Sequence, residues 1–409
     1  MGALMNEGML DGIRVLDLTM WAFCPSAARV LAEWGADVIH IENPNAPDPM
    51  RIFAGGSLEP GGAAWMFKHY NRGKRSLALN LATDEGRDML YELVKKSDVF
   101  ITSFLPKTRA KLGFDVDDLK KINPKLIYAK GTGAGPLGPE NLRGGYDAAS
   151  WWSRGSLSSS AMVVTGTGTP PGMVGHGDGM SGLVFAGGIC AALLKRERTG
   201  EAAVVDSSLM GTAAWFNAPA IIGAQLAPGA GMLGAFIERS ASQWSGTWYQ
   251  TSDVRFIYMS FLGDHQDEFE DLARLIGHEE LITDTRFDST ANRMQNSPAL
   301  MAILDEVFAT KTLTEWKTIL LPSKGVWAPV QTAAEMTDDP MAIANGMIRR
   351  PANEPGTPVI VMPPVMFNED AGAGNPAPDF GQHTDVILTE LLGIDTARIK
   401  ELRESRIIA

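Results

Sequence analysis

Cysteine is scarce in this chain, and the two cysteines present form no motif. Cys24 and Cys190 lie far apart in 409 residues, with no CxxC or Cys/His cluster near either of them. This argues against a disulfide framework and a structural zinc site, and it fits a reducing cytosol. The six histidines do not cluster at metal-ligand spacing either, so we expect no metal site.

Positive charge and long apolar runs are also in short supply. The formal net charge is −12, which disfavours general nucleic-acid binding, although a small anionic ligand needs only a few local cations. The longest apolar stretch, 183–194, is shorter than the roughly 20 residues that a membrane span needs. Residues 1–12 lack the basic start and apolar stretch of a signal peptide. We therefore expect a cytoplasmic protein without membrane or nucleic-acid partners.

The remaining composition is that of an ordinary globular protein, and the N-terminal pattern indicates an α/β fold. Of all residues, 45% are hydrophobic and 21% charged, and the length favours two domains. Residues 13–18 predict a strand, Pro25 opens a helix that Gly35 ends, and 38–41 predict the next strand. Such a βαβ unit implies a parallel pair with a right-handed crossover.

Strands and helices continue to alternate after this unit. Further strands are expected at 76–81, 99–101, 126–129 and 202–206, and Thr83 should cap a helix between the first two. This pattern predicts a doubly wound, Rossmann-like parallel sheet. We expect a loop over 156–178, a buried helix over 180–195, a hairpin from 243–249 to 255–260, and a strand over 358–367. The Pro/Gly-rich linker at 227–231 then gives a large domain over 1–226, a small α+β domain over 227–334, and a C-terminal return to the large domain over 335–409.

An acidic residue enters an apolar, aromatic segment at Gly145-Tyr146-Asp147, which continues into Trp151 and Trp152. Carboxylates are seldom buried without a reason. Asp147 is interpreted either as the N-cap of the helix that follows it, or as a desolvated nucleophile held at a helix N-terminus. The two interpretations are compatible.

Glycine-rich motifs for nucleotides are missing, whereas two cationic segments stand out. Residues 19–25 contain no GxGxxG, and the glycine run at 131–135 leads into Pro136 rather than a helix. One cationic segment is 71–75; the other follows the strand at 99–101 and carries Lys107, Arg109 and Lys111. Strand–helix connections are where a doubly wound sheet binds phosphates, although such runs can also be plain solvated surface.

In the order of its motifs, the sequence resembles the class III CoA-transferase family, which includes formyl-CoA transferase, carnitine-type CoA-transferases and 2-methylacyl-CoA racemases. The resemblance covers essentially the whole chain. No single motif is decisive, but their joint order is specific. The motifs that carry it are 10–19, 31–39, Asn71-Arg72-Gly73-Lys74-Arg75-Ser76, Gly144-Gly145-Tyr146-Asp147, 195–200, Asp284-Thr285-Arg286-Phe287, Arg293 and Gly381-Gln382-His383-Thr384.

The resemblance implies that Asp147 is the nucleophile of a CoA transfer between carboxylic acids. Asp147 would attack an acyl-CoA to give a mixed anhydride and then an aspartyl-CoA thioester, from which an acceptor acid takes the CoA. Coenzyme A is thus a substrate, with no permanently bound cofactor. The family's homodimers are interlocked, which implies the same here. Gly145 and Tyr146 complete the predicted catalytic group, with glycines 229–234 as alternative oxyanion donors, and the predicted CoA contacts are Met20, Trp21, Ala22, Asn43, Arg51, Arg72, Lys74, Arg75, Ser103, Phe104, Arg109 and Lys111.

Several positions depart from the patterns of individual family branches. Racemases carry His before the nucleophile's position, where this chain has Tyr146, and their second carboxylate corresponds to Asp178. A phenol is a poor base, which favours a transferase; a racemase, or a CoA-binding protein without catalysis, remains the alternative. Ala22 and Asn43 replace a Gln and an Arg, which argues against formate or oxalate. Residues that suggest a bulky apolar acyl group, or are simply core, are Met20, Trp21, Phe23, Trp151, Trp152 and Met162.

Overall fold

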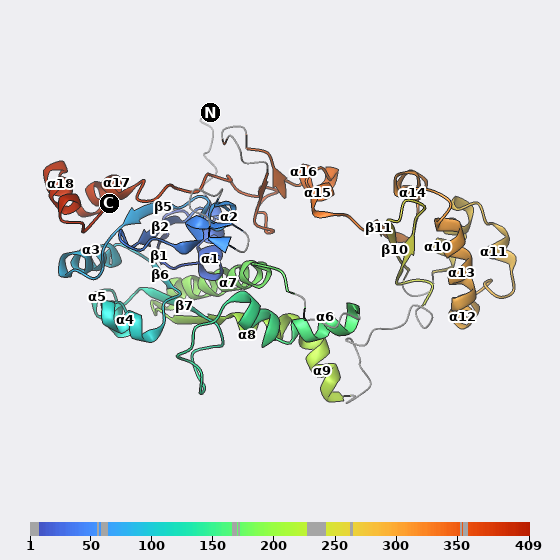
Figure 1. Cartoon of the computed structure of the whole chain (residues 1–409), viewed down its shortest axis with the longest axis horizontal. Coiled ribbons are helices and arrows are strands. Elements are labelled where there is room, and N and C mark those ends of the chain that lie inside the picture. Colours follow the sequence, from blue (N-terminus) through green and yellow to red (C-terminus); the bar gives the residue numbers. More distant parts are fainter. Residues whose placement is uncertain are drawn as a thin grey trace. The chain divides into compact units, whose positions relative to one another are not determined.

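The computed structural model describes residues 8–54, 57–58, 64–165, 170, 172–226, 243–261, 265–351, 354 and 359–409. The chain divides into two compact units (Figure 1). Unit 1 comprises Met1–Gly234 and Pro340–Ala409, and unit 2 comprises Ala235–Asp339. The chain thus leaves unit 1, builds unit 2 and returns to unit 1. The predicted linker at 227–231 lies outside the described residues.

Unit 1 is built on a six-stranded sheet in which each neighbouring pair is parallel. The strand order is β5-β2-β1-β6-β7-β8, so the order reverses between β1 and β6. This is the order of a doubly wound fold, in which ligands bind beyond the carboxyl ends of the strands near the reversal. The strands are β1 (Arg14–Leu18), β2 (Asp37–Glu42), β5 (Arg75–Ala78), β6 (Val99–Thr102), β7 (Ile127–Thr132) and β8 (Val204–Ser208).

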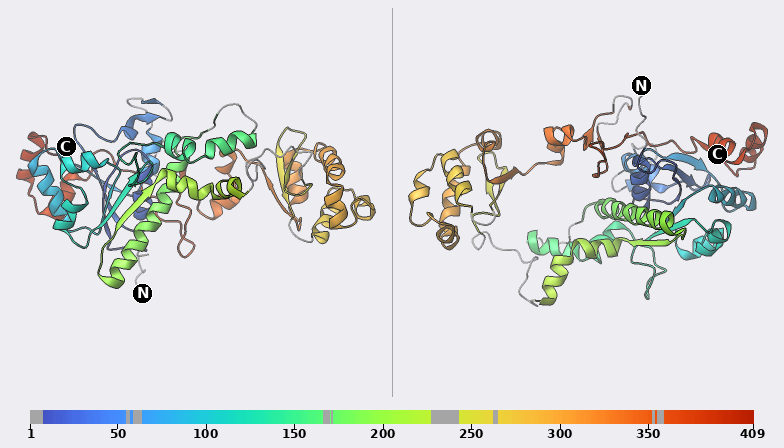
Figure 2. Two further views of the ribbon diagram at one scale, coloured as in Figure 1. Left: turned by 90° about the horizontal axis from the view of Figure 1, so that it is seen from below. Right: turned by 180° about the vertical axis from the view of Figure 1, so that it is seen from behind.

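Helices cover both faces of this sheet, because successive strand residues point to opposite sides. Leu16 of β1 packs with the helices of one face, whereas Val15 packs with those of the other. Figure 2 shows α7 as the longest helix on its face. The first face is covered by α3 (Asp84–Lys95), α5 (Val116–Ile122), α17 (Thr384–Leu392) and α18 (Thr396–Glu404), and the second by α1 (Phe23–Glu33), α7 (His176–Thr199) and α8 (Leu209–Phe216).

Helix α7 is the one helix, within the described part of the chain, that is long and apolar enough to cross a membrane by length and composition. Its residues Phe185, Ala186 and Ile189 are buried in the core that α7 shares with α1 and the sheet. We interpret α7 as a packed helix of the α/β unit, since such core helices pass the same test.

Some local predictions were wrong. Residues 157–165 form a helix, α6 (Leu157–Thr165), where a loop was expected; the Asn217 amide donates to the hydroxyls of Ser156 and Ser160, a tertiary interaction that the Ser-rich sequence conceals. The expected strand at 358–367 is reduced to β13 (Ile360–Val361). Other unit 1 elements are η1 (Pro49–Ile52), β3 (Phe53–Ala54), β4 (Ser57–Leu58), α2 (Trp65–Asn71), α4 (Pro106–Leu112), η2 (Asp147–Ser153), α9 (Ala218–Leu226), α16 (Pro340–Ala344) and β12 (Ile348–Arg349).

Unit 2 is an α+β structure with its own core. Its antiparallel sheet has the order β11-β10-β9, and β9 with β10 forms the predicted hairpin. Trp244, Phe269, Phe308 and Trp316 are buried between this sheet and the helices. The elements are β9 (Thr247–Gln250), β10 (Phe256–Ser260), β11 (Val326–Pro329), α10 (Gln266–Leu275), α11 (Glu280–Thr283), α12 (Thr290–Gln295), α13 (Ser297–Phe308), α14 (Leu313–Leu320) and α15 (Ala333–Met336).

Candidate active site

A pocket of about 800 Å³ lies in unit 1 beyond the carboxyl ends of β1, β6 and β7. Its walls come from the segments that follow these strands, from residues 144–148 and from residues 172–175 ahead of α7. The strand order reverses between β1 and β6, so this is where a doubly wound sheet opens a crevice. No group of three or more His, Cys, Asp or Glu that could hold a metal ion occurs among the residues described.

Asp147 lines this pocket and is 7% exposed. It is the first residue of the π-helix η2, whose N-cap is Tyr146 and lacks a side-chain cap. The N-cap interpretation of Asp147 is therefore wrong. Its Oδ2 instead accepts a hydrogen bond of 3.0 Å from the backbone amide of Gly175, the N-cap residue of α7. The carboxylate thus lies at the N-terminus of a helix distant in sequence, where the helix dipole favours negative charge.

Asp147 shares the pocket with a second carboxyl group, that of Asp178. Burial raises the pKa of Asp147, while the amides of Gly175, Gly177 and Asp178 act to lower it. Burial and the charge of Asp147 raise the pKa of Asp178 to about 7. Opposing effects thus act on the Asp147 carboxyl, whereas those on Asp178 all favour its neutral form.

Glycines let the backbone approach the Asp147 carboxylate closely. A Cβ on Gly177 would lie 2.4 Å from Asp147 Oδ1 and 2.2 Å from Cγ of the Trp151 ring. A Cβ on Gly145 would lie 2.2 Å from the Ser150 hydroxyl, and one on Gly133 would lie 2.7 Å from the Gly145 Cα. Gly133, Gly145 and Gly177 therefore bring β7, the Asp147 segment and α7 together.

Replacing Gly177 with alanine is expected to displace the Asp147 carboxylate. The added methyl group would overlap both Asp147 Oδ1 and the Trp151 ring. We expect an overpacking cost of about 1–3 kcal/mol and a fall in turnover of roughly 100-fold, because displacement by about 1 Å suffices for that loss. Thermal unfolding and steady-state kinetics measure the two effects. Gly187→Ala on the same helix is the control, since a Cβ there meets nothing within 4 Å.

Trp21 holds an unusual backbone conformation beside Asp147, with φ of 70°. Its amide donates to Asp48 Oδ1 at 3.1 Å, and its ring meets that of Tyr146 edge-on at 5.5 Å. Asp48 also accepts from the Met50 amide, and burial raises the pKa of Asp48 to about 6. Strain in a non-glycine residue persists where the surroundings determine it. Asp48 fixes Trp21 in this way, a role that the sequence argument missed although Asp48-Pro49 is a helix-start signal.

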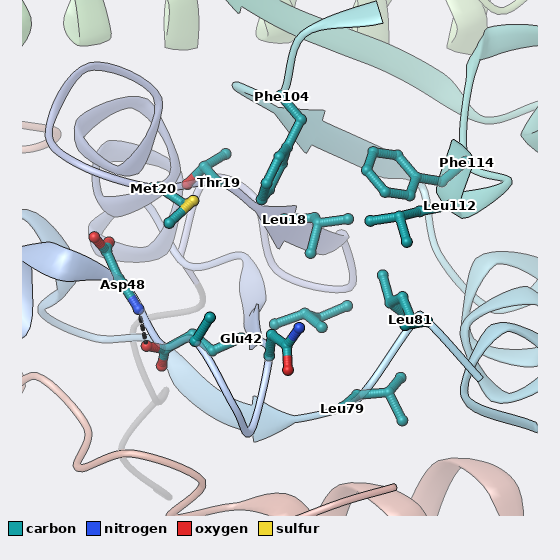
Figure 3. Close-up of a pocket in the computed structure, with 14 residues that line it drawn as sticks. Leu18, Thr19, Met20, Glu42, Asp48, Leu79, Leu81, Phe104, Leu112 and Phe114 are labelled. Carbon is teal, nitrogen blue, oxygen red and sulfur yellow. Dashed lines mark hydrogen bonds between the residues drawn. The ribbon is translucent and has the colours of Figure 1, made fainter. Parts of the chain in front are cut away.

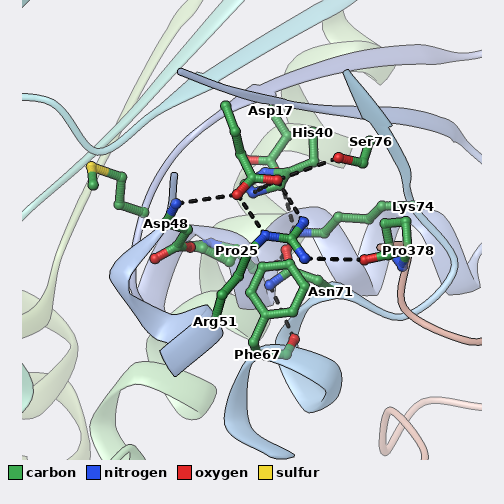
Figure 4. A network of polar contacts seen from close by, with 12 residues as sticks. Asp17, Pro25, His40, Asp48, Arg51, Phe67, Asn71, Lys74, Ser76 and Pro378 are labelled. Atoms are coloured by element: carbon green, nitrogen blue, oxygen red, sulfur yellow. Dashed lines mark hydrogen bonds and ion pairs between the residues drawn. The ribbon is translucent and has the colours of Figure 1, made fainter. Parts of the chain in front are cut away.

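Several predicted cations are engaged in ion pairs, and one of these lies in a fully buried network (Figure 4). The Lys74 ammonium is 2.7 Å from Asp17 Oδ2, which also lies 3.0 Å from Nδ1 of His40. Burial would raise the pKa of Asp17, but Lys74 and His40 hold it well below the usual range. Arg51 forms a bidentate pair with Glu42. Lys74 is thus inside the protein rather than on the pocket wall.

Two more of the predicted cations lie away from the pocket walls. Arg72 is buried and pairs with Glu354. Arg75 opens β5, at the amino end of the strands, where it pairs with Asp37. The cations of 71–75 therefore serve as structural ion pairs, and the interpretation of this segment as solvated surface is also wrong for Arg72 and Lys74, which are buried.

The second cationic segment lies closer to the pocket. Arg109 lines it, although its guanidinium is bonded to Asp115 and to the Phe104 carbonyl. Lys107 and Lys111 are exposed on α4. Ser103 and Phe104 also line the pocket.

Figure 3 shows a smaller pocket, of about 160 Å³, which shares wall residues with the large one. The predicted CoA contacts Met20 and Phe104 line both, whereas Asn43 lines only the smaller one. Ala22 is buried and lines neither pocket. The other walls of the smaller pocket are mostly apolar, with two carboxylates among them, and comprise Leu18, Thr19, Ile41, Glu42, Ala46, Asp48, Leu79, Leu81, Ala82, Leu112 and Phe114.

The large pocket has mostly apolar walls. Four of the residues that were predicted for an acyl pocket line it, namely Met20, Trp21, Phe23 and Trp152. Trp151 is buried in the core, and Met162 lies on α6; neither lines the pocket. Wall residues that the sequence did not predict include Met50, Phe53, Met66, Gly175 and Leu209, which segments distant in sequence supply, and Cys24, which directly follows the predicted Phe23.

Comparison with known proteins identifies the family to which this chain belongs. The sequence profile described as CoA-transferase family III matches residues 10–384. The chain is 30% identical to (R)-2-hydroxy-4-methylpentanoate CoA-transferase of Clostridioides difficile, over 98% of this chain and 99% of the relative. It is 29% identical to cinnamoyl-CoA:phenyllactate CoA-transferase of Clostridium sporogenes, over 98% and 97%. A crystal structure of a CAIB/BAIF family protein from Brucella suis superposes with a TM-score of 0.77, at 27% identity over 94% and 100%. The protein belongs to CoA-transferase family III, the enzymes that transfer CoA between carboxylic acids.

Proposed function

We propose that Asp147 is the nucleophile of this CoA transfer. The observation that carries the proposal is the state of its carboxylate, which is removed from water, bonded at Oδ2 to the Gly175 amide, and without a hydrogen-bond partner at Oδ1 among the described residues. A carboxylate is a better nucleophile when it is desolvated, and the α7 N-terminus limits the cost of keeping it charged.

The reaction then proceeds through two covalent species on Asp147. The carboxylate attacks the acyl-CoA carbonyl and releases CoA, giving a mixed anhydride. The CoA sulfur attacks the aspartyl carbonyl and releases the acid, giving an aspartyl-CoA thioester. An acceptor carboxylate attacks the thioester and the sequence runs in reverse. The amide of Gly145 is the oxyanion donor that we propose within the described residues, because it lies beside Asp147 in the pocket wall.

The test of this route is the mass of the intact protein after incubation with an acyl-CoA and trapping with hydroxylamine or borohydride. We expect a CoA-sized or hydroxamate adduct that maps to the peptide containing Asp147. An adduct on another peptide, or turnover without any adduct under trapping, would contradict the proposal.

We also propose that coenzyme A occupies the two adjoining pockets. We place the adenine in the smaller one, whose mostly apolar walls suit a flat aromatic ring. Met20 and Phe104 line both pockets, so the pantetheine arm passes between them toward Asp147. Lys107 and Lys111 lie four residues apart, on one exposed face of α4, and are the cations that we assign to the phosphates. Arg51, Arg72, Lys74 and Arg75, engaged in ion pairs, are not part of this assignment.

A bulky apolar acid is the substrate that the large pocket supports. Trp21, Phe23, Met66 and Trp152 line it, and its volume of about 800 Å³ exceeds what a small dicarboxylate fills. The names of two relatives, a 2-hydroxy-4-methylpentanoate and a phenyllactate CoA-transferase, point to branched and aryl acids.

A comparison of acceptors tests the acyl class. With one acyl-CoA donor, 4-methylpentanoate is expected to give a kcat/KM at least about 10-fold above that of succinate, because the apolar walls leave a second carboxylate unpaired. Trp152→Ala should weaken this preference by raising the KM for 4-methylpentanoate more than that for succinate. A preference of the wild type for succinate would refute the assignment.

We further propose a cytoplasmic, interlocked homodimer. Both cysteines are free, which fits a reducing compartment. Large apolar side chains of α8 and α9 are exposed within unit 1, among them Trp215 at 79% and Ile222 at 57%. Patches of this kind mark association surfaces, and a second copy is the partner that the family resemblance implies.

A further inference from the structure

Asp178 carries a carboxyl group for which the transfer as described has no use. It is the third residue of α7 and lines the same pocket as Asp147. Within the described residues no hydrogen bond or ion pair holds its side chain, and the effects on its pKa are burial and the charge of Asp147, which raise it to about 7.

The two carboxyl groups are unequal, and the inequality follows from the start of α7. Asp147 receives the Gly175 amide at Oδ2 and the field of the helix N-terminus. Asp178 is part of that helix and receives neither cation nor amide. Two carboxylates in one apolar pocket do not both ionise readily, so the better stabilised one holds the charge and the other holds the proton. When the pKa values of two neighbouring carboxyl groups are separated in this way, one group can act as the nucleophile and the other as the acid.

The other titratable groups around Asp178 do not supply a proton to the pocket in its place. Tyr70 of α2 donates to the Gly175 carbonyl, and burial together with Asp178 and Asp147 raises its pKa far above neutrality. Burial and the charges of Asp17 and Asp178 raise the pKa of Cys24 on α1. Lys130 of β7, on the adjoining sheet, pairs with Asp206. The charge of His176 on α7 acts to lower the pKa of Asp147, but His176 is exposed and is not among the pocket walls. Neither α8 nor η2 carries a Lys, Arg or His.

The CoA sulfur that leaves during transfer therefore meets a pocket with little positive charge. Arg109 is the one Lys or Arg among the described wall residues, and it is already bonded to Asp115 and the Phe104 carbonyl. A thiolate formed there would be poorly stabilised unless a proton reached it. A thiol of the cysteine kind has a pKa of about 8.5, so a carboxyl group that titrates near 7 can protonate it favourably.

We infer that Asp178 is a catalytic acid and base at the CoA sulfur, an inference that rests on the proposed role of Asp147. As the bond between the acyl carbon and sulfur breaks, the Asp178 carboxyl passes its proton to sulfur, so that the anhydride, CoA thiol and an Asp178 carboxylate form together. When the thiol attacks the aspartyl carbonyl, Asp178 recovers the proton, the anhydride C–O bond breaks and the acid leaves as a carboxylate. The acceptor half repeats these transfers in reverse, and no proton is gained or lost overall.

The experiment measures single-turnover formation of the covalent CoA adduct from 4-methylpentanoyl-CoA, by quenched intact mass, between pH 5.5 and 9. For the wild type the rate is expected to fall about 10-fold per pH unit above pH 7, as Asp178 loses its proton. Asp178→Asn cannot transfer a proton; it should react about 100-fold more slowly at pH 6 and show no fall near pH 7. Asp178→Glu should restore the fall, at the pH set by the pKa of the new carboxyl group, because it again carries a titratable carboxyl group.

Controls separate this inference from its alternatives. Asp88→Asn removes an exposed carboxylate of α3 and should reproduce the wild-type profile. Thermal unfolding and CoA binding of Asp178→Asn should match the wild type, which excludes a folding defect. A wild-type rate or an unchanged fall near pH 7 in Asp178→Asn would overturn the inference, as would a fall that disappears in Asp48→Asn instead. Absence of any adduct on the wild type would refute the role of Asp147, a different result.

Discussion

Replacing Asp147 with asparagine is expected to abolish the covalent CoA adduct and to lower turnover by at least about 10⁴-fold. The amide has nearly the shape of the carboxylate and its oxygen can still accept from the Gly175 amide, so the site keeps its structure. What it lacks is the carboxylate oxygen that we propose as the nucleophile. The measurement is intact mass after incubation with 4-methylpentanoyl-CoA and hydroxylamine, together with steady-state transfer to an acceptor acid.

The control for this prediction is Asp88→Asn, which makes the same chemical change on the exposed face of α3. It should form the adduct and turn over like the wild type. CoA binding by Asp147→Asn should remain within a few-fold of the wild type, since the adenine and phosphate contacts that we propose are elsewhere. Persistence of a mappable adduct in Asp147→Asn would show that another residue carries the acyl group.

Replacing Lys74 with methionine is expected to destabilise unit 1 by about 3–5 kcal/mol. Lys74 donates to Asp17 Oδ2, the Pro25 carbonyl and Asn71 Oδ1 at 2.7–2.9 Å, and both ionic side chains are fully buried. Without the ammonium the Asp17 charge keeps only part of its compensation, from His40. Loss of this size is a large fraction of the 5–15 kcal/mol that stabilises typical domains. Chemical denaturation measures it.

Lys95→Met provides the matched comparison. Lys95 forms an exposed pair with Glu92 one helical turn away, and loss of such a pair costs about 0.5 kcal/mol or less. The result also decides between two roles of Lys74. A phosphate contact would lose CoA affinity with little change in stability, whereas the buried pair predicts the opposite.

Local sequence signals predicted the α/β unit well because neighbouring residues decide them. Apolar runs bounded by Gly and Pro marked the strands, and the Thr83 cap began α3 where expected. The position of α6 was mispredicted, since Asn217, far along the chain, bonds to the serines of its first turn. The cationic residues of 71–75 were visible in the sequence. Their role in ion pairs could not be predicted, because their partners Asp17, Asp37 and Glu354 are distant in sequence.

The sequence by itself determined the family and the alternation of strands and helices, because motif order and periodicity are properties of the chain. It also marked Asp147 as an acidic residue that enters an apolar, aromatic segment. Tertiary structure alone decided which helix N-terminus holds Asp147, since Gly175 lies 28 residues further along and meets it only after folding. It also decided that Asp178 shares the pocket and titrates near 7. Burial and the field of a neighbouring charge depend on what surrounds a group in space, which the order of residues does not state.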